Sequence, residues 1–257
     1  GGLGTFDPKD IGPAEMHYQN GHLDFLADDE AEATAITKKL LSFFQGAKKD
    51  WEEKDQTPLR TMIPEDRRKG FPVRDILNTI ADEGSFLEMK KIFGRSVITG
   101  FMRIEGRPFA VLANDCQQLG GAIDSAAADK AANFIEICSA HGLPMLSFVD
   151  TPGFMVGPDS EKEGAFRRMG ELFKHGARIK TPLVGIILRR GYGLGAMAMM
   201  GGSFVDPIYS ASWPNGEFGG MGLEGYVKLG FKKELEAEET EEKKKALFDK
   251  LVARMYE

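Results

Sequence analysis

The residues with the clearest chemical potential form a glycine-rich turn, in which every second residue is a glycine: Gly191, Gly193 and Gly195. Residues 196–200, which are good helix formers, follow at once. Glycine lets a backbone turn sharply and approach a ligand closely. The first N–H groups of a helix have no partner within that helix, so this turn presents free donors to an anion. One interpretation is an oxyanion hole, in which backbone amides stabilise an enolate or a similar oxyanion.

Dinucleotide and phosphate binding are two other functions of glycine turns, and the spacing fits neither. A dinucleotide site requires G-x-G-x-x-G after a strand, and a P-loop requires G-x-x-x-x-G-K-[ST]. The turn in this chain reads G-x-G-x-G-A. The alternative that stays open beside the oxyanion hole is a turn whose glycines serve only the packing of a helix against a strand.

The elements that must position this turn belong to an α/β sheet. Residues 183–188 are a short apolar run, which predicts a strand that is buried on both faces and ends at Arg189 and Arg190. Residues 109–113 and 144–149 predict two further strands, and helical patterns separate the three. In open α/β sheets the loops at the carboxyl ends of the strands lie along one edge, where ligands bind. We therefore expect the loops after these three strands to lie side by side.

The central part of the chain predicts a hairpin and two helices around that sheet. Residues 97–104 pair with 109–113 across a short turn. Asp124 is expected to cap a helix that ends at Gly142. A further helix is expected over residues 163–179.

The N-terminal third predicts a lead-in to the sheet. Residues 1–20 are rich in glycine and proline and are expected to be irregular, and residues 23–26 predict a short strand. Asp28 or Asp29 is expected to cap a helix over residues 30–44, and the apolar stripe of this helix is expected to pack on the core. Residues 45–70 predict a charged, solvated connector. Residues 73–93 predict one helix or two.

Composition and charge narrow the class of protein. The 257 residues are 42% hydrophobic and 28% charged, as in an ordinary globular protein. A net charge of -6 and a pI near 5.4 argue against a surface for nucleic acid or anionic membranes. Cys116 and Cys138 lack metal-ligand spacing, and the histidines are scattered, so no metal site is expected. Free thiols indicate a reducing compartment, the cytoplasm or the mitochondrial matrix.

Taken together, several motifs of the chain resemble those of a known family. They cover nearly the whole chain and include residues 64–66 and 71–74, the run 114–124, residues 148–154 and residues 189–199. The chain resembles the C-terminal half of the carboxyltransferase (β) subunit of biotin-dependent acyl-CoA carboxylases, of the propionyl-CoA carboxylase β-chain type. The resemblance implies that the chain is a fragment of a longer protein, without the acyl-CoA-binding N-terminal half.

This resemblance implies a fold, a reaction and partners. The implied fold is crotonase-like, a spiral of stacked β-β-α units with flanking helices, in one domain over residues 1–257 with 1–69 as lead-in helix and connector. The implied reaction moves a carboxyl group from carboxybiotin to the α-carbon of an acyl-CoA. The implied partners are a biotin carboxyl carrier domain, biotin carboxylase, the N-terminal carboxyltransferase half, and further copies of the chain in a dimer to hexamer. Neither a nucleic acid nor a membrane is expected as a partner.

The resemblance also implies roles for residues of the turn and of two neighbouring loops. In the family each half supplies one oxyanion hole, and the hole of the C-terminal half faces biotin. The implied donors are Leu194 and Gly195, with Gly193 and Ala196 adjacent. The residues implied to contact biotin are Gly120, Gly121, Gly153 and Phe154.

One position of the turn is implied to select the acyl group. Propionyl-type relatives read Y-G-G-A-Y-D where this chain reads Y-G-L-G-A-M, so that Met197 stands in place of an aspartate. In the family this side chain faces the acyl pocket across a dimer. The alternative is that Met197 only packs the helix, since methionine is a common filler of irregular gaps.

Two alternative activities stay open. The first is the carboxyltransferase subunit of a biotin-dependent acyl-CoA decarboxylase, which runs the transfer in reverse. The second is a crotonase-like enzyme that acts on a CoA thioester with this half alone and uses an acidic side chain. Asp150 and Glu217 are the nearest candidates for that role, and we expect both to be structural. We also expect this chain alone not to carboxylate acyl-CoA.

Overall fold

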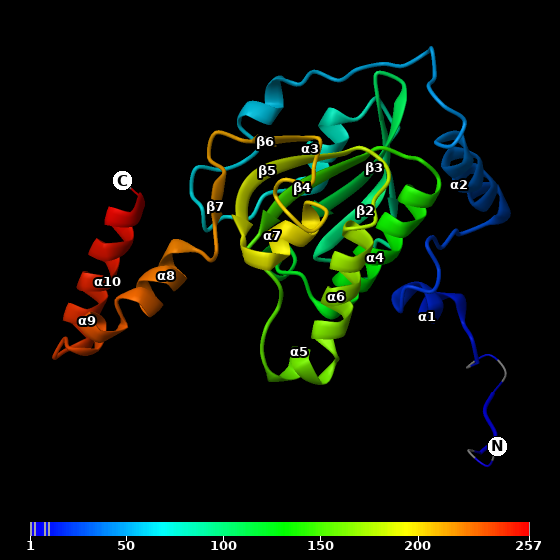
Figure 1. The fold of residues 1–257 in the computed structure, drawn as a ribbon. Helices are drawn as coiled ribbons and strands as arrows, with labels where there is room; N and C mark the ends of the chain where they lie inside the picture. Colours follow the sequence, from blue (N-terminus) through cyan, green and yellow to red (C-terminus); the bar gives the residue numbers. More distant parts are fainter. Residues whose placement is uncertain (1, 3, 8, 10, 257) are drawn as a thin grey trace.

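A mixed sheet forms the centre of the computed structural model, which describes residues 2, 4–7, 9 and 11–256 (Figure 1). Its strands follow one another across the sheet in chain order: β1 (Leu87–Met89), β2 (Val97–Ile104), β3 (Arg107–Asn114), β4 (Met145–Thr151), β5 (Leu183–Tyr192) and β6 (Tyr209–Ser212). A last strand, β7 (Glu217–Gly219), pairs with the end of β5. Strands β1 to β3 are antiparallel and β3 to β6 are parallel. The α/β class and the three predicted parallel strands are confirmed.

The predicted hairpin joins β2 and β3 through a two-residue turn. Glu105 and Gly106 have φ angles of 51° and 73°, and Ile104 faces Arg107 across the pair. Turns with two positive φ angles match the twist of the strands that they join. The buried carboxylate of Asp82 accepts the N–H groups of Glu105 and Gly106 at 2.9 and 2.8 Å. This aspartate therefore fixes the turn at the opposite end of β3 from the predicted site.

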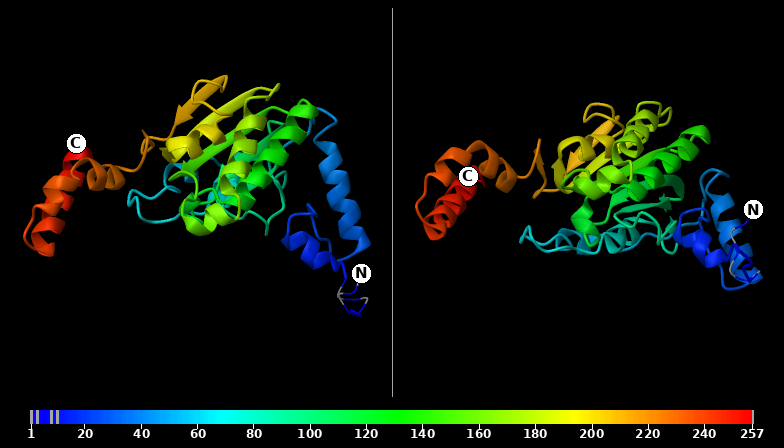
Figure 2. Two further views of the ribbon diagram at one scale, coloured as in Figure 1. Left: turned by 60° about the horizontal axis from the view of Figure 1, so that its bottom comes forward. Right: turned by 90° about the horizontal axis from the view of Figure 1, so that it is seen from below.

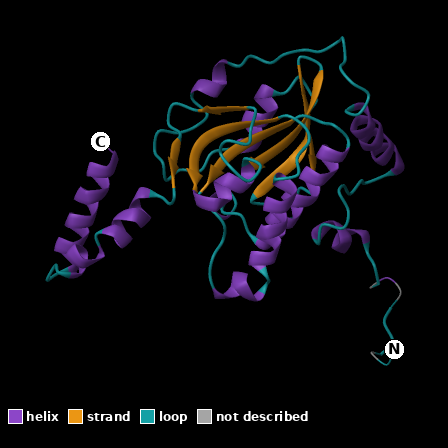
Figure 3. Ribbon diagram, viewed as in Figure 1, coloured by secondary structure: helices purple, strands orange, loops and turns teal. Residues whose placement is uncertain are grey.

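Helices cover both faces of the sheet (Figure 3). The helices α4 (Ser125–Ala140), α6 (Ala165–Gly176) and α7 (Gly193–Met199) lie on one face, and α3 (Val73–Ile80) lies on the other (Figure 1). Successive residues of β4 and β5 point to opposite faces, so that Val149 and Ile187 join the first core while Phe148 and Leu188 join the second. The prediction of a strand buried on both faces is confirmed for β5.

The predicted caps are present at two helices. Asp124 accepts the N–H of Ala127 at 2.8 Å at the start of α4. Asp29 accepts the N–H of Glu32 at 2.7 Å at the start of α2 (Glu30–Ser42). A free N–H group at a helix start is satisfied in each case.

Several predictions for the N-terminal part were wrong. Residues 1–20 hold a helix, α1 (Ala14–Gln19), although residues 1, 3, 8 and 10 lie outside the described part. Residues 23–26 form no strand, because their backbone meets a loop rather than a strand edge: the carbonyl of Asp24 accepts the N–H of Lys90 at 2.9 Å. The predicted second helix ends at Ile80, and β1 follows because residues 87–89 pair with β2.

The apolar stripe of residues 30–44 packs on the core over only part of its length, through Leu40 and through the ring of Phe44, which contacts that of Phe101. Leu41 is 53% exposed, Phe44 is 38% exposed, and Leu40 is only partly buried. The connector that follows is irregular as predicted, apart from the short 3-10 turn η2 (Thr57–Arg60).

The C-terminal helices form an arm that projects away from the sheet (Figure 2). It consists of α8 (Leu223–Gly230), α9 (Lys232–Glu236) and α10 (Glu241–Tyr256), which pack on one another. The last helix returns toward the body of the molecule at Tyr256, whose ring lies 3.7 Å from the guanidinium carbon of Arg67. A short helix, α5 (Pro158–Lys162), leads into α6 at the other side of the molecule.

Candidate active site

The loops after β3, β4 and β5 meet at one edge of the sheet, as predicted. Between the first two loops, the N–H of Ile123 donates to the carbonyl of Gly153 at 3.0 Å. The second and third loops approach so closely that a Cβ added to Gly195 would lie 2.7 Å from the Cα of Gly153. A Cβ added to Gly121 would lie 2.2 Å from the carbonyl oxygen of Asp150. Glycine is therefore required at these two positions by close backbone approach.

The glycine turn differs from its prediction in where the strand ends. β5 does not end at Arg189 and Arg190 but continues to Tyr192, because β7 pairs with its last three residues. The helix α7 then begins at Gly193, which has a φ angle of 58° that glycine adopts without strain. No residue thus separates the strand from the helix, and the chain turns at Gly193 itself.

Free N–H groups lie at the start of α7. No turn, loop or cap hydrogen bond among the described residues uses the N–H of Leu194 or Gly195 as a donor. The first N–H groups of a helix are left without helical partners, and they attract negative charge. Leu194 is 63% exposed, whereas Gly195 is buried. The geometry is suited to binding an oxyanion through the main chain.

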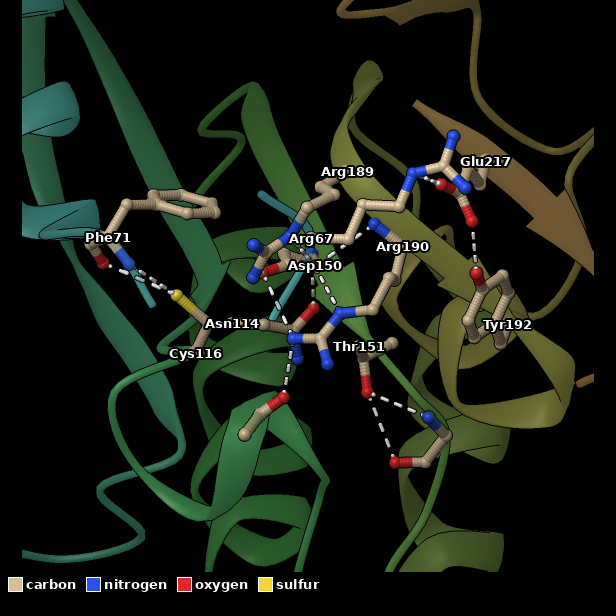
Figure 4. Close-up of polar contacts among 12 residues, drawn as sticks. Arg67, Phe71, Asn114, Cys116, Asp150, Thr151, Arg189, Arg190, Tyr192 and Glu217 are labelled. Atoms are coloured by element: carbon tan, nitrogen blue, oxygen red, sulfur yellow. Dashed lines mark hydrogen bonds and ion pairs between the residues drawn. The ribbon is translucent and has the colours of Figure 1, made fainter. Parts of the chain in front are cut away.

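A buried ion cluster supports the turn (Figure 4). We call Asp150, Arg189 and Arg190 the two-arginine cluster. Asp150 is fully buried, and its carboxylate accepts from Nη2 of Arg189 at 2.9 Å and from Nε of Arg190 at 2.8 Å. Burial acts to raise the pKa of Asp150, but the hydrogen bonds and charges of Arg190 and Arg189 outweigh it and lower the pKa. Asp150 is therefore an ionised structural group, as expected from the sequence.

A cleft of about 330 Å³ adjoins the turn on the side of Tyr192. The hydroxyl of Tyr192 donates to Oε2 of Glu217 at 2.5 Å, and Nε of Arg67 lies 2.8 Å from Oε1 (Figure 4). The contact with Arg67 is an ion pair without hydrogen-bond geometry, since Oε1 has no hydrogen-bond partner. Burial and the nearby carboxylates of Glu217 and Glu224 raise the pKa of Tyr256, at the mouth of the cleft, to about 12. Both tyrosines are neutral at physiological pH, because burial and Glu217 also raise the pKa of Tyr192.

The structure brings together most of the residues that were predicted for the site. Gly121 lies against the backbone of Asp150, Gly153 and Phe154 lie against Ile123, and Gly120 lines the cleft. Ala196 is fully buried behind the turn. Met197 is partly buried in α7, and its carbonyl accepts the N–H of Gly202 at 2.8 Å. Leu194 and Gly195 lie outside the lining of the cleft, which adjoins the turn through Tyr192.

Sequence reasoning missed the side chains that line the cleft. Arg67 and Tyr256 come from segments far apart in the chain, and their spacing carries no signal. Arg190 and Tyr192 had a readable signal, because charged and polar residues at the carboxyl end of a buried strand are expected to face a site.

Neither a metal-holding cluster nor a membrane-spanning helix is found in the part of the chain that the structure describes. It has no group of three or more His, Cys, Asp or Glu side chains arranged to hold a metal ion. None of its helices combines the length and the apolar character needed to cross a membrane. Cys116 and Cys138 are both buried and free.

Solved structures of two proteins share this fold. A single-chain, multi-domain long-chain acyl-CoA carboxylase superposes with a TM-score of 0.91 at 45% sequence identity, over 99% of this chain and 26% of that chain. The transcarboxylase 12S structure with methylmalonyl-CoA bound superposes with a TM-score of 0.83 at 30% identity, over 98% of this chain and 49% of that one. The predicted crotonase-like fold is confirmed.

Curated relatives agree with the structural comparison. The chain is 33% identical to the methylmalonyl-CoA carboxyltransferase 12S subunit of Propionibacterium freudenreichii, over 89% of this chain and 45% of that protein. It is 33% identical to the propionyl-CoA carboxylase beta chain of Saccharopolyspora erythraea, over 93% of this chain and 47% of that protein. The chain thus spans about half the length of these relatives. Residues 2–257 match the model of the carboxyl transferase domain, and the chain belongs to this family.

Proposed function

We propose that this chain is the biotin-facing half of a carboxyltransferase that moves a carboxyl group from carboxybiotin to the α-carbon of an acyl-CoA. The observation that carries the proposal is the pair of free N–H groups of Leu194 and Gly195 at the start of α7. They lie at the sheet edge where the loops that hold Gly121 and Gly153 converge. The family to which the chain belongs gives the reaction class.

The main chain performs the proposed chemistry. Carboxybiotin, when bound, supplies the carboxyl group and leaves negative charge on the oxygen of its ureido ring. Leu194 and Gly195 donate their N–H groups to that oxygen, and such preorganised donors act where charge develops. Neither acidic candidate serves as a base, because Asp150 is held by two guanidinium groups and Glu217 by Tyr192 and Arg67.

The partners in this proposal follow from the same assignment. An N-terminal carboxyltransferase half binds the acyl-CoA, a carrier domain delivers the biotin that biotin carboxylase has loaded, and copies of the chain assemble. The buried free thiols of Cys116 and Cys138 suit a reducing compartment, the cytoplasm or the mitochondrial matrix.

The test observes the two amides directly. Biotin is titrated into the isotope-labelled chain, and backbone amide signals are followed by NMR. We expect saturable shifts at Leu194 and Gly195, with weaker shifts at Gly153. Lipoic acid is the matched control ligand, since it has a similar acid tail and sulfur ring but no ureido oxygen, and we expect it to leave these signals in place.

Two outcomes would count against the proposal. Equal shifts with lipoic acid would mean that the turn does not recognise the ureido group, and an absence of shifts with biotin would place the biotin site elsewhere. Acyl-CoA turnover by the chain alone would favour a crotonase-like enzyme that needs only this half.

A further inference from the structure

An irregularity in the sheet lies directly before the glycine turn. Val149 pairs with Ile187, but Thr151 pairs with Gly191. The single residue Asp150 on β4 therefore faces three residues of β5, whereas a regular ladder would oppose it with one. Such bulges bend the strand and redirect side chains, and they are frequent next to active sites.

This bulge changes where two consecutive side chains point. Neighbouring residues of a strand normally point to opposite faces of the sheet. Here Arg189 and Arg190 both reach the carboxylate of Asp150, which receives Nε and Nη2 of each guanidinium at 2.8 to 3.4 Å. The buried carboxylate of Asp150 thus binds the guanidinium groups of two consecutive residues in the bulge (Figure 4).

The same carboxylate also holds the backbone of β5. Oδ1 of Asp150 accepts the main-chain N–H of Arg190 at 3.0 Å, only two residues before Tyr192. Through the arginines it reaches two more segments, because Arg190 donates to the carbonyl of Gly120 at 2.7 Å and Arg189 to that of Lys69 at 2.6 Å. This one side chain therefore contacts β5 just before its end and, through the arginines, two further segments around the turn.

We propose that Asp150 is the positioning residue of the oxyanion hole, which orients the N–H groups of Leu194 and Gly195 by closing the bulge in β5. This role rests on the proposed function of the turn. It requires no proton transfer, in keeping with a carboxylate that is fully buried and holds five donor groups.

The experiment compares two buried aspartates that each hold backbone N–H groups. Asp150→Asn keeps the shape of the side chain and removes its charge and one acceptor. Asp82→Asn does the same at the hairpin turn, at the opposite end of the sheet. Each variant is titrated with biotin and followed by NMR, as is the unmodified chain. We expect Asp150→Asn to weaken biotin binding at least tenfold and to move the amide signals of Leu194 and Gly195 before any ligand is added. Asp82→Asn should change neither.

A second variant guards against misfolding of the first, since Asp150→Asn leaves two guanidiniums without a carboxylate. Asp150→Asn combined with Arg189→Met keeps the net charge of the cluster and most of its volume, while the carboxylate is still lost. Wild-type biotin affinity in either folded variant, with unmoved amide signals at the turn, would overturn the proposal. If the unmodified chain shows no ureido-dependent shifts, the proposed function fails instead. The ligand-free signals then still report whether Asp150 sets the turn.

Discussion

Two buried ion clusters lie at the carboxyl ends of the strands, and they have opposite compositions. The two-arginine cluster combines one carboxylate with two guanidinium groups. The second, which we call the two-carboxylate cluster, combines the guanidinium of Arg74 with the carboxylates of Glu88 and Asp115. The first therefore holds one excess positive charge and the second one excess negative charge.

The second cluster has a buried cationic neighbour that balances it. The ammonium group of Lys130 is buried and donates to the carbonyls of Lys90 and Phe93 at 2.9 and 3.0 Å. Burial lowers its pKa to about 8, whereas the charge of Glu88 acts to raise it. The two-carboxylate cluster is thus close to neutral with Lys130 charged, and its role is structural.

The excess charge of the two-arginine cluster has a different meaning. A buried charge is costly unless it is paired. Among the described residues, Asp150 is the only carboxylate that pairs with Arg189 or Arg190. Their sequence neighbours are the residues of the glycine turn, where we propose that an oxyanion develops. Under the proposed function, the cluster with excess positive charge is therefore the one that adjoins, in sequence, the turn where the oxyanion develops.

The largest expected difference between the clusters is in stability. Asp150→Ala leaves two buried guanidiniums unpaired, and loss of one partner from a buried pair costs about 3–5 kcal/mol. Asp115→Ala should cost less, because Arg74 is partly exposed and keeps Glu88. Urea unfolding of both variants measures the difference. Equal losses of unfolding free energy would show that the two clusters are equivalent supports.

The next effect concerns the turn that the two-arginine cluster supports. Gly195→Ala places a Cβ 2.7 Å from the backbone of Gly153, so we expect a loss of about 1–3 kcal/mol through overpacking. In Gly191→Ala the nearest atoms are 3.3 Å away and include the flexible side chain of Ile187, so the loss should stay under about 1 kcal/mol. Thermal unfolding of both variants checks the order. The reverse order would mean that Gly195 of α7 does not pack against Gly153 in the loop after β4.

Much of this arrangement was predictable from the sequence. The apolar run 183–188 and the glycines after it indicated a strand, a turn and a helix start. The paired Gly120 and Gly121 and the glycine at 153 indicated close backbone approach at the same edge. These signals are local, because residue type and spacing determine them.

The remainder depended on contacts that sequence spacing does not encode. β5 extends to Tyr192 because its end pairs with β7, which begins 25 residues further along the chain. The bulge opposite Asp150 comes from the register of two strands, and no single strand carries its pattern. The stripe of residues 30–44 has the right period for a core face, yet it packs on the core through Leu40 and Phe44 while Leu41 stays exposed.

An effect of similar size is predicted at Met197, which follows the turn in α7. If Met197 shapes the acyl pocket, Met197→Ala should change the preference between short and longer acyl-CoAs by about 1–3 kcal/mol without loss of turnover. The ratio of kcat/KM values for two acyl-CoAs in the assembled carboxyltransferase measures this. A fixed ratio with a lower melting temperature would identify Met197 as a core residue only.

A further prediction tests the charge of the two-carboxylate cluster. The folded pKa of Lys130 is about 8 and its ordinary value is 10.5, so the unfolded chain binds more protons between these values. Stability contributed by this residue should therefore rise with pH from 8 to 10.5. Lys130→Met should remove that rise, which melting temperatures over this range detect. An unchanged slope in the variant would show that Lys130 does not titrate there.

The most direct test of the proposed oxyanion hole removes one N–H and keeps every side chain. Leucic acid in place of Leu194 converts the amide to an ester, while Leu194→Ala keeps the N–H and removes the exposed side chain. Carboxyl transfer from a carboxylated carrier domain is measured for both, with the N-terminal carboxyltransferase half present. The ester should lower the rate by about 10²–10³, the usual effect of losing one oxyanion donor, and Leu194→Ala should stay near the unmodified rate. An ester variant as active as the alanine variant would contradict the assignment of the hole to this turn.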